Sequence, residues 1–141
     1  VNVRQLVKEL GLEDQVVLPG KVSDEILPAL YRQAQMLVFP SLYEGFGLPP
    51  LEAMACGTPV AASRISSIPE ILGEAAVYFD PYSVEDIAES INKILLEQNL
   101  RKELVDKGLY QAKNFSWKKC ARETLGVYNS VSEKVFAGIP S

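Results

Sequence analysis

Apolar residues cluster along this chain in short unbroken runs and in longer stripes at helical spacing. The short runs are too brief for a helix and are typical of strands buried on both faces of a parallel sheet. Four such runs predict strands over residues 15–18, 36–39, 58–62 and 75–79. The third run tolerates Pro59 because the first position of a strand needs no ladder donor.

The stripes predict helices between and after these strands. The first covers residues 1–12, with apolar residues at 3, 6, 7 and 10 and Gly11 as its C-terminal stop. A turn over 23–27 is expected to lead into a second helix that ends at Ala34. The remaining helices are expected over residues 49–56, 69–73, 84–95, 100–113 and from 117 onward.

The helices at the end of the chain carry clear start signals. Ser83 and Ser116 have the hydroxyl that favours an N-cap, so helices are expected to begin at Val84 and Trp117. The apolar stripe of the last helix is expected to lie in the core. It consists of Trp117, Cys120, Leu125, Tyr128 and Val131.

The order of these elements predicts the fold class. Strands alternate with helices throughout the first 97 residues, which indicates a parallel sheet with right-handed crossovers. The whole chain has 141 residues, the length of one domain, and contains no internal repeat. We therefore expect an α/β fold with a doubly wound parallel sheet of about four strands, followed by C-terminal helices.

Composition excludes several kinds of chemistry. The net charge of −4, without a basic run, argues against nucleic acid or an anionic membrane as the main partner of this segment. The chain has no histidine, which removes Ser-His hydrolysis, imidazole bases and histidine–metal sites. Cys56 and Cys120 fall in apolar helical patterns and are expected to be buried or half-buried thiols in a reducing compartment. No apolar run approaches the roughly 18 residues of a transmembrane helix.

Residues 40–52 hold the highest density of special backbone residues. They begin where an apolar run ends and close on a helix start at Pro49. Gly45 and Gly47 allow positive φ and let a ligand approach the backbone closely. Successive amides in such a turn, next to the positive end of a helix dipole, form a concavity that favours anions. The geometry predicts a ligand with phosphates.

Two carboxylates bracket this turn, and their chemistry alone leaves their roles open. Glu52 is either an acid that stabilises the helix dipole or an acceptor for a vicinal diol such as ribose. Glu44 is either a solvated turn residue or a carboxylate that faces a sugar or a developing positive charge. Phe46 or Tyr43 could close over a ring or anchor the loop in the core.

The literal sequence of the region narrows these alternatives. Glu44 and Glu52 are separated by seven residues that include Gly-Phe-Gly-Leu-Pro, and residues 52–60 continue as Glu-Ala-Met-Ala-Cys-Gly-Thr-Pro-Val. This closely resembles the Glu-x7-Glu region of the group-1 retaining glycosyltransferases, which have the GT-B fold of two Rossmann-like domains. The resemblance extends to residues 20–23, 67–70 and 78–81.

The resemblance implies a role for each residue of the motif. Glu52 would bind the ribose hydroxyls of a nucleotide-diphosphate sugar. Glu44 would contact the donor sugar and support a transition state that resembles a glycosyl cation. Backbone amides would hold the sugar and diphosphate, at Gly45, Phe46, Gly47 and Leu48. The nucleobase would lie against the backbone of Gly20, Lys21 and Val22. Such enzymes need neither a metal nor a separate cofactor.

The same resemblance implies that residues 1–141 form a partial donor-binding domain. The acceptor domain and the first two Rossmann-like strands would be absent. In the strand order 3-2-1-4-5-6 those strands lie between the segments 15–18 and 36–39, so strand edges would be exposed. We expect these two segments to pair directly, or the chain to self-associate.

The family's diphosphate-binding Arg and Lys would also precede Val1. Lys21 and Arg64 are the nearest basic residues, but neither stands at those positions. The segment is therefore expected to be inactive alone. The full protein is expected in the cytoplasm, in polysaccharide biosynthesis, with any membrane contact at the inner face made by its other domain.

Two further interpretations remain open. One is a non-catalytic binding or interaction module that uses the same Rossmann-like fold. The other is a GT-B relative, such as a sugar-nucleotide epimerase or a phosphorylase, although the segment lacks a cofactor lysine typical of phosphorylases.

Overall fold

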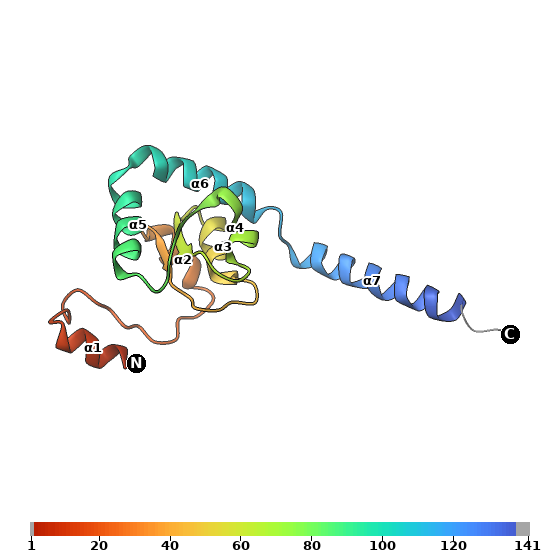
Figure 1. Cartoon of the computed structure of the whole chain (residues 1–141), viewed down its shortest axis with the longest axis horizontal. Helices are drawn as coiled ribbons and strands as arrows, with labels where there is room; N and C mark the ends of the chain where they lie inside the picture. The colour runs from red at the N-terminus through yellow and green to blue at the C-terminus, as the bar shows by residue number, and fades with distance from the viewer. Residues whose placement is uncertain (1, 138–141) are drawn as a thin grey trace.

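The computed structural model describes residues 2–137 and contains a parallel three-stranded sheet (Figure 1). The strands are β1 (Leu37–Phe39), β2 (Val60–Ser63) and β3 (Ala76–Phe79), in the order β1-β2-β3. Val38 lies opposite Ala61, which in turn lies opposite Val77. This order corresponds to consecutive strands on one half of a doubly wound sheet.

Helices cover both faces of the sheet. On one face, α3 (Leu48–Ala55) and α4 (Ile68–Leu72) pack on Val60 and Ala62 of β2; a short 3₁₀ turn, η1 (Gly73–Ala75), follows α4. On the other face, α5 (Val84–Leu96) packs on Ala61, with Ile94 fully buried. Because successive strand residues point to opposite faces, β2 is buried on both sides. The α/β, doubly wound prediction is confirmed.

A close contact joins helices α3 and α6. α6 (Gln98–Ala112) crosses α3, and Gly108 of α6 lies against Met54 of α3. A Cβ at Gly108 would stand 3.1 Å from Cγ of Met54, tighter than ordinary van der Waals contact. The absence of a side chain at Gly108 therefore lets the two helices approach each other.

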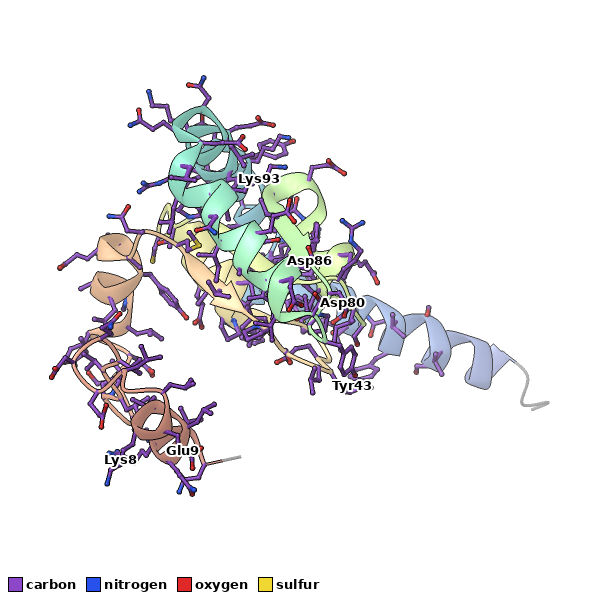
Figure 2. All side chains as sticks on the ribbon, turned by 60° about the vertical axis from the view of Figure 1, so that its left-hand side comes forward. Lys8, Glu9, Tyr43, Asp80, Asp86 and Lys93 are labelled. Carbon is purple, nitrogen blue, oxygen red and sulfur yellow. The ribbon has the colours of Figure 1, made fainter. Side chains whose placement is uncertain are left out.

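The predicted start of α5 is confirmed. The N–H of Asp86 donates to Oγ of Ser83 at 3.1 Å, which caps the helix. The Asp86 carboxylate accepts from the N–H of Asp80 at 2.7 Å, and Figure 2 shows the two aspartates close together. These bonds fix the turn between β3 and α5.

The strand predicted at 15–18 is wrong. Residues 13–15 form a turn, residues 16–20 have no regular structure, and Val17 is 84% exposed. A strand exists only when its backbone groups find a partner. Within residues 2–137, β1 pairs with β2 alone, so the sheet has three strands rather than about four. Direct pairing of 15–18 with 36–39 does not occur, and self-association stays a prediction.

The elements before the sheet are short helices. α1 (Val3–Glu9) begins at the side-chain cap of Asn2, and α2 (Leu27–Gln33) packs against α3. Figure 1 shows α1 and the segment after it beside the main body, while α2 lies within that body. Both helices were predicted, although the first is shorter than the expected 1–12.

The core assignment for the last helix is wrong. α7 (Trp117–Ala137) begins with the predicted Ser116 cap but projects away from the body (Figure 1). Trp117 is 79% exposed, and Cys120 and Tyr128 are exposed as well. The stripe is amphipathic, but no element in the described part of the chain covers it. Cys56 is half-buried, as expected.

Among the helices of residues 2–137, none combines the length and apolarity that a bilayer crossing requires.

Candidate functional site

The loop of residues 40–47, the β1–α3 loop, joins the end of β1 to the start of α3. Gly47 is the N-cap residue of α3 and has φ +95°, a conformation that strains any residue with a Cβ. The nearest atom to a Cβ there would be 4.0 Å away, on Ile68, so the backbone angle rather than space demands glycine. The prediction of positive φ is confirmed at Gly47.

Gly45 differs from Gly47. It has no positive φ, which corrects the expectation that both glycines do. A Cβ at Gly45 would meet nothing within 4 Å, because the residue is exposed and faces open space. Gly45 therefore leaves room beside the loop, whereas Gly47 supplies its conformation.

The start of α3 leaves amide groups unsatisfied. Pro49 and Pro50 have no N–H, and no side chain caps the helix. Within residues 2–137, the amides of Gly45, Phe46, Gly47 and Leu48 make no hydrogen bond to the protein. Four successive free donors next to the positive end of a helix can receive an anionic group. The anion-binding concavity expected here from the sequence stays a prediction.

Glu44 is held on two sides. Its Oε1 accepts a hydrogen bond from Oγ of Ser41 at 3.2 Å, and its carbonyl oxygen accepts from Ser66 and Ser67 at 2.7 and 3.0 Å. The residue is half-buried, so it is not the freely solvated turn residue that was the alternative. Oε2 has no hydrogen-bond partner within residues 2–137.

Glu52 lies in α3 and is joined to α2. The hydroxyl of Tyr31 donates to Oε2 of Glu52 at 3.3 Å, and the hydroxyl of Thr58 donates to the carbonyl of Tyr31 at 2.6 Å. Burial and the Glu52 charge raise the pKa of Tyr31 to about 12, so the phenol stays a donor even in alkaline solution where an ordinary tyrosine ionises. Tyr31 was not predicted, because nothing in the local pattern separates it from the apolar stripe of α2.

The two aromatic residues of the loop have different surroundings. The ring of Phe46 meets that of Phe115 edge-to-face, with centroids 5.7 Å apart, which anchors the loop to the end of α6. Tyr43 is 81% exposed and points outward in Figure 2. The alternative of an anchoring aromatic thus applies to Phe46, and Tyr43 remains accessible.

The remaining predicted residues are not joined to the loop. Gly20 has φ +73° and is exposed, as is Lys21, while Val22 is half-buried. In the described part of the chain, no hydrogen bond or ion pair connects them to residues 40–52. Arg64 lies over the ring of Tyr78 at 5.5 Å, beyond the end of β2. The structure therefore places Glu44 and the four amides along the β1–α3 loop and the first residue of α3, with Glu52 one turn further along α3. Among the described residues, no such bond connects 20–22 to them.

Open surface grooves lie elsewhere on the molecule. One is lined by residues of α6, including Arg101 and Lys102, and another by residues of α1 and 13–18. Neither includes a residue of the β1–α3 loop. The candidate site is thus an exposed loop and helix start rather than an enclosed cavity.

Comparison with known proteins identifies the family of the chain. The family described as "Glycosyl transferases group 1" matches residues 1–110. The chain is 44% identical over 124 residues to O-antigen chain mannosyltransferase B of Escherichia coli, covering 88% of this chain and 32% of that protein. It is 39% identical over 137 residues to the MMP alpha-(1->4)-mannosyltransferase of Mycolicibacterium hassiacum, covering 94% of this chain and 33% of that protein.

A solved structure is similar over nearly the whole chain. Sucrose-phosphate synthase from Thermosynechococcus elongatus superposes with a TM-score of 0.86 at 31% identity, over 94% of this chain and 34% of that one. The chain thus spans about a third of the length of these relatives. Because the family model matches most of its length, the chain belongs to the group-1 glycosyltransferase family.

Proposed function

We propose that this chain forms the donor site of a retaining glycosyltransferase, which moves a sugar from a nucleotide diphosphate to a saccharide, lipid or glycan acceptor. One observation carries the proposal. Two carboxylates, Glu44 and Glu52, flank a helix start at which four consecutive amides have no partner within residues 2–137. Phosphate oxygens fit such donors, and sugar and ribose hydroxyls fit the carboxylates.

The chemistry follows from where charge develops. As the glycosidic bond breaks, negative charge grows on the leaving diphosphate and is stabilised by the amides of residues 45–48 and the dipole of α3. Positive charge grows on the sugar's anomeric carbon, and the Glu44 carboxylate lies in the same loop to stabilise it. Glu52 accepts hydrogen bonds from the ribose hydroxyls. The amides thus stabilise the negative charge of the diphosphate by hydrogen bonding, a task that a metal ion performs in other enzymes.

The proposal assigns the acceptor site to another part of the protein. The backbone of Gly20, Lys21 and Val22 contacts the nucleobase once the donor-binding domain is complete. We infer that the 141-residue chain binds the donor but does not transfer it alone, since it spans about a third of the length of its relatives. Because two of the relatives are mannosyltransferases, a mannose nucleotide is the first donor to test.

Titration calorimetry of the chain with GDP-mannose, UDP-glucose and ADP-glucose tests the donor site. We expect one of them to bind to the wild type and to lose affinity in Glu52→Ala, by roughly 10- to 100-fold for the loss of hydrogen bonds to a charged group. Glu89→Ala is the matched control, because Glu89 is an exposed acid on α5. It should bind as the wild type does.

The other interpretations predict different outcomes. A non-catalytic interaction module would bind none of the three nucleotides, with or without Glu52. An epimerase would convert a nucleotide sugar to its epimer without an acceptor, which analysis of the sugar products detects. Sugar transfer by the 141-residue chain alone would contradict the inferred need for a second domain.

A further inference from the structure

The carbonyl oxygen of Glu44 is held by a second loop. Oγ of Ser66 donates to it at 2.7 Å and Oγ of Ser67 at 3.0 Å. Both residues, here called the serine pair, lie between β2 and α4, more than twenty positions later in the chain. A carbonyl oxygen has two lone pairs, so the two hydroxyls satisfy it fully.

The backbone of Ser66 is unusual in a way that serves this contact. Its φ is +52°, and it is the one non-glycine residue with positive φ in residues 2–137. Few residues with a Cβ adopt this conformation, and those that do are held there by their surroundings, often at functional sites. In an extended backbone, the side chains of two successive residues point in opposite directions. The left-handed backbone of Ser66 instead lets the hydroxyls of Ser66 and Ser67 reach the same carbonyl oxygen.

A third hydroxyl holds the side chain of the same residue. Oγ of Ser41 lies 3.2 Å from Oε1 of Glu44 and 3.1 Å from the carbonyl of Tyr43. Ser41 follows β1 and the serine pair follows β2, and the carboxyl ends of parallel strands meet at one edge of a sheet. Ser41 has one hydroxyl proton, which these two acceptors share. Glu44 is therefore held at its backbone by the serine pair, and its carboxylate contacts a hydroxyl of its own loop.

We propose that Ser66 and Ser67 are positioning residues that fix Glu44 against the donor sugar, with the strained backbone of Ser66 maintained for that purpose. This inference rests on the proposed donor site. It assigns a role to the β2–α4 loop, which itself carries no group that reacts. Since Glu44 acts on the sugar, the serine pair controls recognition of the sugar rather than of the nucleotide.

Two substitutions of Ser66 distinguish the effect of losing its hydroxyl from the effect of its strained backbone. Ser66→Gly and Ser66→Ala both remove the hydroxyl, but only alanine retains a Cβ at positive φ. In the chain without ligand, we expect the melting temperature of Ser66→Gly to exceed that of Ser66→Ala. Both variants should lower the NMR order parameters of residues 43–46. Order parameters equal to those of the wild type would show that the serine does not hold the loop.

Binding measurements with two ligands then distinguish a specific effect on the position of Glu44 from a general loosening of the loop. We expect both variants to bind the nucleotide sugar roughly 3- to 10-fold more weakly, the effect of one lost hydrogen bond, and to bind the nucleotide diphosphate without its sugar as the wild type does. Ser130→Ala, which removes an exposed hydroxyl on α7, is the control and should change neither. Equal weakening of both ligands, or no weakening, would overturn the inference.

The two proposals fail in different ways. Wild-type chain that binds no nucleotide sugar would overturn the donor assignment and the purpose given to the serine pair. A wild type that binds donor and loses it in Glu52→Ala, with Ser66→Gly unaffected, would leave the donor site standing and overturn the serine pair alone.

Discussion

The hydroxyl of Tyr31 lies 3.3 Å from Oε2 of Glu52 and joins α2 to α3 at the site. The bond occupies one carboxylate oxygen and limits how the side chain can rotate. In the proposed donor site, a ligand diol would meet a carboxylate whose orientation this bond already limits, and both Oε1 and the second lone pair of Oε2 could accept from it. Preorganisation of this kind lowers the entropy lost on binding.

Tyr31→Phe tests this arrangement. We expect the dissociation constant of the nucleotide sugar to rise about threefold, because a hydrogen bond worth about 0.5–1.5 kcal/mol no longer orients Glu52. Calorimetry measures the change, and Tyr128→Phe, at an exposed position on α7, is the matched control. Tyr31→Phe in combination with Glu52→Ala should bind no worse than Glu52→Ala alone. An additive loss would mean that Tyr31 acts independently of Glu52.

The raised pKa of Tyr31 predicts a dependence on alkaline pH. The folded-state pKa is about 12, above the ordinary value of 10.0 for tyrosine, so the folded protein retains a proton that the unfolded chain releases first. The stabilisation is fully present below pH 10 and is lost as the pH rises toward 12. The unfolding free energy of the wild type should fall more steeply through this window than that of Tyr31→Phe.

A second phenol provides an internal comparison for that measurement. Burial and the nearby charge of Glu74 also raise the pKa of Tyr78 to about 12. Ultraviolet titration of phenolate should therefore show a late step that Tyr31→Phe and Tyr78→Phe each reduce. If Tyr31→Phe left the late step intact, the assigned environment of Tyr31 would be incorrect.

The two glycines of the β1–α3 loop predict opposite stability effects. Gly47→Ala forces a Cβ into φ +95° and should lower the unfolding free energy by about 1–3 kcal/mol. Gly45→Ala has no such strain and should leave stability unchanged or raise it by about 0.4–1 kcal/mol. Its methyl group nevertheless enters the open space beside the amides, so donor binding should weaken in a folded protein. Denaturant unfolding and calorimetry together distinguish the two effects.

The α3–α6 contact predicts a large steric effect at Gly108. Gly108→Leu should destabilise the protein by about 1–3 kcal/mol, because a Cβ there already stands 3.1 Å from Met54. Met54→Ala should recover part of this loss when combined with Gly108→Leu, although it leaves a cavity alone. Gly126→Ala on α7, where nothing lies within 4 Å of a Cβ, is the control and should not destabilise. If the losses in unfolding free energy from Gly108→Leu and Met54→Ala were strictly additive, the contact between the two residues would be contradicted.

Local sequence was sufficient wherever local physics decides the structure. The start of α3 at two prolines, the cap at Ser83 and the left-handed Gly47 depend on neighbouring residues, and each was predicted. The strand at 15–18 failed because a strand depends on a partner rather than on its own pattern. The exposed Trp117 failed for a related reason: an amphipathic stripe predicts that a face can be buried, but not what buries it.

The candidate site also combines features that neighbouring residues determine with features that depend on tertiary packing. Glu44, Glu52 and the amides between them lie close in sequence, so their spacing was enough to propose them as one site. Tyr31, Ser66 and Ser67 reach them across 21 to 23 residues and carry no local signal of that contact. Their contributions depend on side-chain hydroxyls that tertiary packing brings to particular oxygens. Periodicity and spacing contain no information about such pairs.

The ring of Phe46 rests edge-on against Phe115, two residues before α7 begins. Phe115 also packs against the core cluster of β2, α3 and α4. The segment from which α7 projects is therefore held both by the core and by the site loop. A molecule bound to the first turn of α7 would lie beside the loop that we propose to receive phosphate.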